Sequence, residues 1–216
     1  MSGSGAADAV RRQQACLAQF GAFAFQEEDL SKMLTTAARA CAACMEVPYV
    51  KICCHRPKEG DLFTVAGCGW GAGVLGHVAA KANGASTQAR TFMTGKPVVI
   101  ENISRDGGAS LPAFYAEQGI ASLAGVSIKG RTGPWGILEV ADTEQRPFDE
   151  HDIIFLTGFA NVVAEAVMAA ERTAASQAAI ESMKKLVAEK DKLLAERTRR
   201  ELQLSELKVE LLHVTR

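Results

Sequence analysis

Several common features are missing from this 216-residue sequence, and each absence argues against a class of protein. No run of about 18 uninterrupted apolar residues is present, and a membrane-spanning helix needs that length. The first residues, 1–7, lack the basic end and apolar centre of a secretory signal. The formal net charge of −1 gives no surplus of Lys and Arg for binding nucleic acid. We therefore predict a cytoplasmic protein with no nucleic-acid partner and no direct membrane contact.

Catalytic and metal-binding patterns are also missing. We find no Ser/His/Asp set and no phosphate-binding loop, because the Gly67-x-Gly-x-Gly run lacks the continuation that cradles a phosphate. The six cysteines are interpreted as reduced thiols. Cys41 and Cys44 share one side of a predicted helix as small apolar residues, whereas Cys53 and Cys54 alternate on a predicted strand. We predict no enzyme activity and no metal site, with redox or metal sensing by cysteines left open as an alternative.

The first two thirds of the chain alternate between helical and strand-like patterns. Apolar spacing predicts helices over 7–24 and from 27 to about 47. Short β-type runs bounded by Gly and Pro predict five strands, at 49–54, 62–66, 97–101, 121–129 and 135–141. Between them we expect short helices at 74–82, 88–94 and 112–118, and a loop at 102–110. This order predicts an α+β fold with a central antiparallel sheet flanked by helices.

The last third of the chain predicts one very long helix. It starts at Phe148-Asp-Glu-His-Asp152, whose carboxylates suit a helix N-terminus, and it contains no proline and no glycine after Gly158. Steps of three and four from Met183 give a mostly apolar seam that Lys190, Arg197 and Arg200 interrupt. A single helix cannot cover such a seam, so we predict a homodimer through the C-terminal helix.

Several segments resemble the GAF domain family. They are Gly67-Cys-Gly-Trp-Gly, Thr94-Gly-Lys-Pro-Val-Val-Ile-Glu-Asn102, Gly133-Pro-Trp-Gly-Ile-Leu-Glu-Val140 and Phe148-Asp-Glu-His-Asp152. The resemblance is strongest to GAF domains at the front of bacterial sensor histidine kinases. The tail Glu206-Leu-Lys-Val-Glu-Leu-Leu-His-Val-Thr-Arg216 is similar to the helix that leads into the phosphotransfer domain of such kinases. The expected organisation is an N-terminal helix over 1–27, a GAF domain over 28–168 and a coiled-coil signalling helix over 169–216.

The resemblance implies a sensory input and dimerisation module of a sensor histidine kinase. The kinase output itself would lie outside this sequence, and the signal would pass through a parallel coiled coil. Two alternatives remain open at this stage. One is a ligand-free structural dimerisation module, and the other is a GAF input to a different output, such as a cyclase or a transcription regulator.

A GAF domain would hold a small-molecule effector between its sheet and the loops above it. The resemblance places the roof at 67–94 and 102–118 and gives six candidate ligand-binding residues, which combine aromatic and polar groups as small-molecule pockets do. These candidates are Trp70, Phe92, Phe114, Tyr115, Ser127 and Glu139. The signature of cyclic-nucleotide-binding relatives and the Cys-His attachment site of bilin-binding relatives are not matched. The cofactor or ligand is therefore unknown from sequence.

Overall fold

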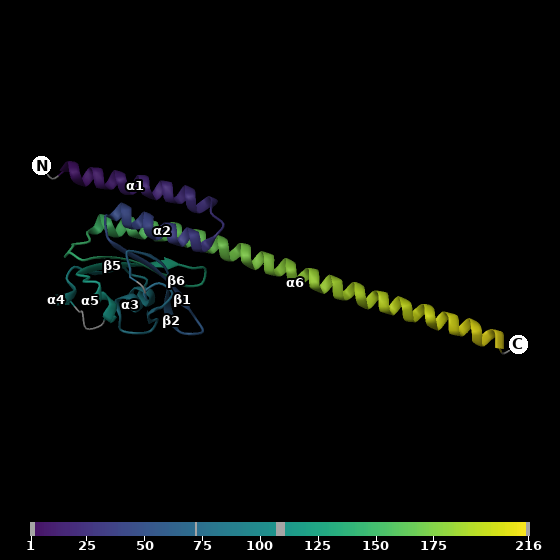
Figure 1. Cartoon of the computed structure of the whole chain (residues 1–216). Coiled ribbons are helices and arrows are strands. Elements are labelled where there is room, and N and C mark those ends of the chain that lie inside the picture. The colour runs from purple at the N-terminus through teal and green to yellow at the C-terminus, as the bar shows by residue number, and fades with distance from the viewer. Residues whose placement is uncertain (1–2, 72, 107–110, 215–216) are drawn as a thin grey trace. The chain divides into compact units, whose positions relative to one another are not determined.

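The central element is a six-stranded antiparallel sheet, seen in a computed structural model that describes residues 3–71, 73–106 and 111–214 (Figure 1). The strands lie in the order β3-β2-β1-β6-β5-β4. Their bounds are β1 Tyr49–Arg56, β2 Asp61–Cys68, β3 Val78–Lys81, β4 Val98–Ile100, β5 Ser122–Lys129 and β6 Pro134–Asp142. Because β1 and β6 lie in the middle, both edges of each strand are paired with a neighbouring strand.

Three helices form the layer on one face of this sheet. They are α1 (Gly3–Gln26), α2 (Leu30–Met45) and the first turns of α6 (Glu150–Val214). α2 begins where the Asp29 carboxylate accepts hydrogen bonds from the amides of Ser31 and Lys32, at 2.8 and 3.1 Å. Side chains of the three helices share one buried cluster with Val50, Ile52 and Leu138 of the central strands. This layer is the principal hydrophobic core.

The opposite face of the sheet is covered by shorter elements. They are α3 (Thr87–Thr94), α4 (Ile103–Asp106) and α5 (Ala113–Glu117), together with the loop that follows β2. Because side chains alternate along a strand, Lys51 and Cys53 of β1 face this side while Val50 and Ile52 face the helical core. The fold therefore confirms the α+β class and the antiparallel sheet flanked by helices.

Two of the predicted connecting segments are wrong. Val78–Lys81 lies within a predicted helix (74–82), yet it forms edge strand β3 and pairs with β2. The predicted loop at 102–110 contains the short helix α4, and residues 107–110 lie outside the described residues. Both segments are too short for apolar periodicity to separate helix from strand or loop, so their tertiary pairing decides.

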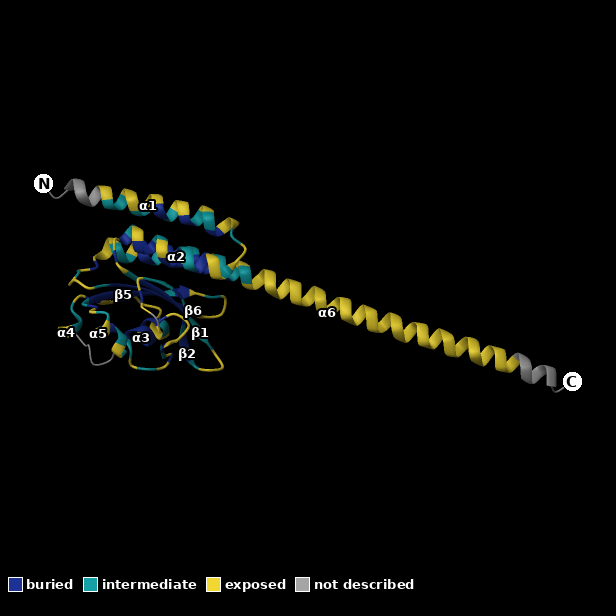
Figure 2. Ribbon diagram, viewed as in Figure 1, coloured by how far each residue is buried: buried dark blue, intermediate teal, exposed yellow. Residues whose placement is uncertain are grey.

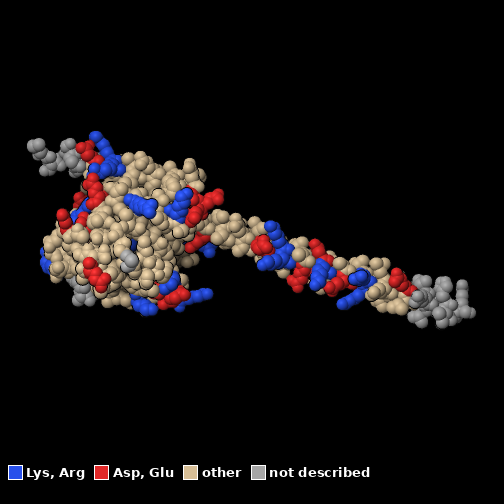
Figure 3. Space-filling view, in the orientation of Figure 1, with Lys and Arg blue, Asp and Glu red and all other residues tan. Residues whose placement is uncertain are grey.

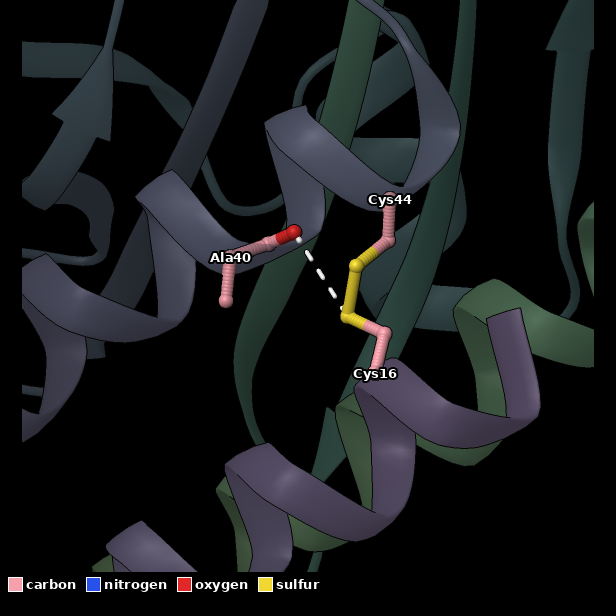
Figure 4. Close-up of a disulfide and its surroundings, with 3 residues drawn as sticks. All are labelled: Cys16, Ala40 and Cys44. Atoms are coloured by element: carbon pink, nitrogen blue, oxygen red, sulfur yellow. Dashed lines mark hydrogen bonds between the residues drawn. A yellow bond between two sulfur atoms is a disulfide. The ribbon is translucent and has the colours of Figure 1, made fainter. Parts of the chain in front are cut away.

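The prediction of six reduced cysteines is also wrong. A disulfide joins Cys16 of α1 to Cys44 of α2, and Cys41, Cys53, Cys54 and Cys68 are unbonded (Figure 4). The two Cα atoms are 6.3 Å apart although 28 positions separate the residues in sequence. Only the packing of α1 on α2 brings the two residues together, and spacing along the chain carries no signal of it.

The distal part of α6, residues 171–216, forms a compact unit separate from residues 1–170. Described side chains along it are exposed, including the large apolar ones, as the continuous yellow ribbon in Figure 2 shows. Acidic and basic side chains alternate along the face in view in Figure 3. The predicted long helix is thus present, and the large apolar side chains described along its distal part are exposed.

Among the described residues, α6 is the one helix that is long and apolar enough to cross a membrane by length and composition. Of its most apolar 18-residue window, 39% is buried inside the structure. Core helices of soluble proteins satisfy the same test, so the predicted absence of membrane contact stays a prediction.

Candidate functional site

A lysine and a glutamate lie side by side at the centre of the sheet, on the face covered by α3 and α5. Lys51 of β1 and Glu139 of β6 are register partners, and Lys51 Nζ lies 3.1 Å from Glu139 Oε1. The two side chains are 0% and 2% exposed. Isolated charges at this depth would carry a large desolvation cost, so the pairing is what allows both to be charged.

Helices α3 and α5 complete the hydrogen bonding of this pair. The Tyr115 hydroxyl donates to Glu139 and accepts short hydrogen bonds from Lys51 Nζ and Gln88 Nε2. Gln88 Nε2 also donates to Glu139 Oε2 at 3.0 Å, and Thr87 Oγ1 donates to Gln88 Oε1 at 3.3 Å. No buried side-chain nitrogen or oxygen among the described residues lacks a partner. We call Lys51, Gln88, Tyr115 and Glu139 the polar cluster.

Aromatic rings surround the ammonium group of Lys51. Lys51 Nζ lies 4.4, 4.9 and 5.2 Å from the ring centroids of Tyr115, Phe114 and Trp70. Cations are attracted to aromatic faces at such distances, and the attraction is larger where water is excluded. Phe114 and Tyr115 also stack on each other at 4.6 Å. An aromatic cage therefore holds one of the chain's own cations.

The backbone that carries Trp70 over the sheet depends on a glycine. Gly69 has φ +85°, and a Cβ there would lie 2.0 Å from the Pro48 carbonyl oxygen. No other residue fits this position without moving the chain. Trp70 then turns inward and its indole N–H donates to the Val50 carbonyl at 3.0 Å. The predicted break in regular structure at the glycine-rich run is what places this ring.

Electrostatics favour the neutral form of the Tyr115 phenol. Burial raises its pKa well above the usual value, and the neighbouring Glu139 carboxylate raises it further. The neutral hydroxyl is the form that can donate to Glu139. The cluster therefore contains one cation, one anion, one phenol and one amide. If Tyr115 or Gln88 gave up a hydrogen bond within the cluster, these groups could bind a ligand that has both donor and acceptor groups.

Four of the six predicted ligand-binding residues come together here: Trp70, Phe114, Tyr115 and Glu139. The structure separates the other two from the cluster. Phe92 of α3 packs against His55, with ring centroids 4.6 Å apart, beside the small core that contains Cys53 and Leu62. Ser127 of β5 lines a surface hollow of about 310 Å³ that also includes Gly95 and Thr157.

Lys51 and Gln88 were not predicted, although both are fully buried members of the cluster. A lysine inside a strand is normally assigned to the solvent face of a half-buried sheet. The available signal is the pair of charged residues in two otherwise apolar runs, Val50-Lys-Ile-Cys53 and Ile137-Leu-Glu-Val140. Both runs read as strands buried on two faces, and a charge in such a strand needs a partner.

Among the described side chains, the cysteines and histidines form no comparable site. Burial raises the pKa of the Cys53 thiol to about 11 and that of the Cys41 thiol higher still. Within the described residues, no group of three or more His, Cys, Asp or Glu side chains is placed to hold a metal ion. His77 is exposed, with Nδ1 3.0 Å from the Leu75 carbonyl.

A six-stranded antiparallel sheet with a helical core on one face and a roofed polar cluster on the other defines an α+β domain. The sequence model of the GAF domain matches residues 29–167. The chain belongs to the GAF family, whose domains are generally sensory and not catalytic. Comparison with curated proteins gives no match.

Solved structures share the fold at low sequence identity. The GAF domain of an Acinetobacter phosphoenolpyruvate-protein phosphotransferase is 20% identical, with a TM-score of 0.67, over 74% of this chain and 95% of that one. Free methionine-R-sulfoxide reductase from Neisseria meningitidis, in complex with its substrate, is 17% identical, with a TM-score of 0.65, over 75% and 91%. A domain of a putative two-component sensor histidine kinase protein from Sinorhizobium meliloti 1021 is 14% identical, with a TM-score of 0.55, over 68% and 95%.

Proposed function

We propose that this chain is the sensory input and dimerisation module of a bacterial sensor histidine kinase. In this proposal an effector or partner changes the packing of the GAF domain, and the change passes along a parallel coiled coil to a kinase output outside this sequence. The module itself is not an enzyme, and it works in the cytoplasm.

The observation that carries the proposal is the exposed apolar seam of the distal helix. Met183, Leu186 and Leu193 are 69, 63 and 60% exposed. They follow the spacing of three and four that defines a coiled-coil seam. Ile180, Met183 and Val187 line an apolar hollow of about 400 Å³ on one side of this helix. A second copy is the occupant that the heptad pattern favours, because the same seam on both helices is self-complementary.

Molar mass measured by light scattering tests the dimer directly. We expect the mass of two chains at micromolar concentration, and a monomer for Leu193→Glu, which places a carboxylate in the seam. Ala195→Glu is the matched control, because it adds the same charge two residues away on the outer side of the helix and should stay dimeric. A monomeric wild-type chain, or equal dissociation of both variants, would contradict the proposal.

The polar cluster is the proposed effector site, and a small-molecule effector is the expected partner. A thermal-shift screen against purines, cyclic nucleotides, amino acids, tetrapyrroles and metal salts tests this. A ligand at 100 times its Kd stabilises the folded state by about 2.7 kcal/mol, enough to move Tm by several degrees. The shift should be lost in Glu139→Gln and retained in Ser127→Ala, which lies outside the cluster.

A second candidate is a ligand-free structural dimerisation module. One observation favours it: every buried polar side chain in the described part of the chain is already satisfied within the protein. Such a cluster needs no ligand to complete it. No thermal shift with any class in the screen, together with an intact dimer, would favour this candidate over the sensory one.

A further inference from the structure

The Cys16–Cys44 disulfide joins the helix that precedes the matched GAF segment to the first helix inside it. α1 ends at Gln26, whereas the GAF match begins at residue 29. Figure 4 shows the two sulfurs bonded between facing turns of α1 and α2. The bond therefore links a helix outside the matched segment to the first helix inside it, and the docking of the outer helix is what the redox state of the pair can change.

Apart from the disulfide, few side chains hold α1 in place. Phe20 and Ala24 are its other buried apolar residues among those described, and Leu17 and Phe23 are half-buried. An ion pair joins Arg12 to Glu46 at 3.2 Å, but both side chains are at least half exposed, and such pairs contribute little. Phe25 is 91% exposed. Loss of the covalent link would leave a helix with a narrow apolar contact.

The same helix contacts the beginning of α6. The Phe20 ring stacks on the Phe159 ring with centroids 4.5 Å apart, and Gln13 Nε2 donates to Asp152 Oδ1 at 3.3 Å. Both contacts fall in the first turns of α6, and the Asp149 carboxylate caps that end of the helix by accepting from the Asp152 amide at 2.9 Å. α1 therefore bridges α2 and the first turns of the helix whose later residues carry the apolar seam.

We propose that Cys16 and Cys44 form a reversible redox switch that controls the docking of α1 on α2 and α6. With the disulfide formed, α1 is held against both helices. With the two thiols reduced, α1 is held by its narrow apolar contact and a few polar contacts, and it exchanges between docked and undocked states.

The chemistry is thiol–disulfide exchange with a small dithiol. Cys44 is half-buried, whereas Cys16 is almost fully buried, so Cys44 offers the more accessible sulfur. One thiolate of the dithiol attacks the sulfur of Cys44, and Cys16 leaves as a thiolate that takes a proton. The second thiol of the reductant then displaces Cys44, which is protonated in turn. Two electrons reach the protein, two protons end on its thiols, and the dithiol becomes a disulfide. A disulfide oxidant reverses each step.

The reduced pair has a local alternative to the disulfide. Cys16 Sγ lies 3.7 Å from the Ala40 carbonyl oxygen, within reach for a thiol donor (Figure 4). A disulfide sulfur has no proton to donate, so this contact becomes a hydrogen bond only after reduction. Cys41, one turn before Cys44, is no competitor for exchange, because its side chain is fully buried.

The docking change rests on contacts within residues 1–170 alone. The effect of α1 docking on signalling rests on the proposed function. In a reducing cytoplasm the two thiols are normally reduced, so oxidation would be the signal. The two can fail separately, because α1 docking is measured by hydrogen exchange and dimerisation by mass.

The experiment compares the chain after oxidised glutathione and after dithiothreitol, by thiol alkylation with mass spectrometry and by hydrogen–deuterium exchange. After oxidation we expect Cys16 and Cys44 to resist alkylation in denaturant while the other four cysteines react. After reduction, amides of residues 8–26 should exchange at least fivefold faster, while β1 and β6 stay unchanged. Cys16→Ser should abolish the redox dependence, and Cys54→Ser, a half-buried unbonded cysteine, should retain it.

Two outcomes would overturn the proposal. One is complete alkylation of Cys16 and Cys44 after oxidation. The other is equal exchange of α1 in the oxidised and reduced chain. If Cys16→Ser does not fold, the comparison of the oxidised and reduced wild-type chain still decides.

Discussion

The buried pair of Lys51 and Glu139 is the residue-scale feature on which the candidate site depends. A buried ion pair is costly to break, because removing one partner leaves the other charge without compensation, at about 3–5 kcal/mol. Replacing both partners removes both charges and restores part of the loss. The effects of single and double mutations on stability should therefore distinguish these two residues from ordinary core residues.

We predict that Lys51→Met and Glu139→Gln each lower the free energy of unfolding by about 3 kcal/mol or more. The double variant should cost clearly less than the sum of the single changes. Urea denaturation of the four proteins measures this coupling. Additive losses would show that the two groups do not act as a pair.

Tyr115 adds a dependence on high pH. Its folded-state pKa is raised, so the stability that it contributes is fully present below its unfolded value of about 10 and is lost as pH rises through the folded value. Above about pH 10, the unfolding free energy should fall by up to about 1.4 kcal/mol per pH unit from this group.

Tyr115→Phe should be less stable at pH 7, by about 1–3 kcal/mol, because the partners of the hydroxyl lose a hydrogen bond. Its stability should then fall less steeply above pH 10 than that of the wild type. Tyr49→Phe serves as the control, because Tyr49 lies at the rim of the same face. Parallel curves for the wild type and Tyr115→Phe would contradict the buried, neutral phenol.

At the scale of elements, the distal helix combines an apolar seam with a basic interruption. Lys190, Arg197 and Arg200 fall in the seam, and Arg197 is paired within the helix to Glu201 at 2.8 Å. Charged residues at core positions reduce coiled-coil stability and keep alternative pairings close in energy. In the proposed function this interruption is what lets a small change in the GAF domain shift the paired helices.

Replacing Lys190, Arg197 and Arg200 with Leu should lower the dimer dissociation constant at least tenfold. A matched control replaces Lys185, Lys192 and Arg199 with Leu; these three residues carry the same total charge but lie outside the seam, so the constant should change little. Sedimentation velocity over a concentration series measures both. In the parent protein the seam variant should also show damped regulation, and unchanged regulation would count against the role of the interruption.

Long elements were predictable from sequence, and short ones were not. The spacing of Leu156, Phe159 and Val163 predicted the buried face of α6, and all three are buried. β3 and α4, each four residues long, carry too little periodicity, and β3 exists because β2 offers it an edge. The Cys16–Cys44 contact depends on how two helices pack, and local sequence patterns do not encode that.

The candidate site was predictable in part for a similar reason. The resemblance to GAF domains gave a roof at 67–94 and 102–118, and the structure brings Trp70, Phe114 and Tyr115 of that roof together with Glu139. Lys51 and Gln88 were missed, because their burial follows from the central position of β1 and the placement of α3 over it. Sheet order, more than strand pattern, decides which polar side chains meet.

At the scale of the whole molecule, the chain carries a GAF domain, matched over residues 29–167, and a distal helix whose described apolar side chains are exposed. The fold comparisons support the domain, whereas the pairing of two distal helices is the proposal on which signalling depends. If the helices pair in parallel, equivalent positions in the two copies lie at the same height along the coil. In an antiparallel pair, equivalent positions of the two copies lie side by side at one point along the coil only.

Distances between spin labels at equivalent positions test that pairing most directly. Labels are attached through a ketone-bearing amino acid at Ala174 or at Ala195, so that native cysteines stay unlabelled, and distances are read by pulsed electron resonance. The two positions are 21 residues apart, about 31 Å along a helix. A parallel dimer predicts short distances at both, set by two adjacent helices of about 10 Å diameter each. An axial distance of at least about 30 Å at either position, or no interaction between copies, would contradict the parallel pairing.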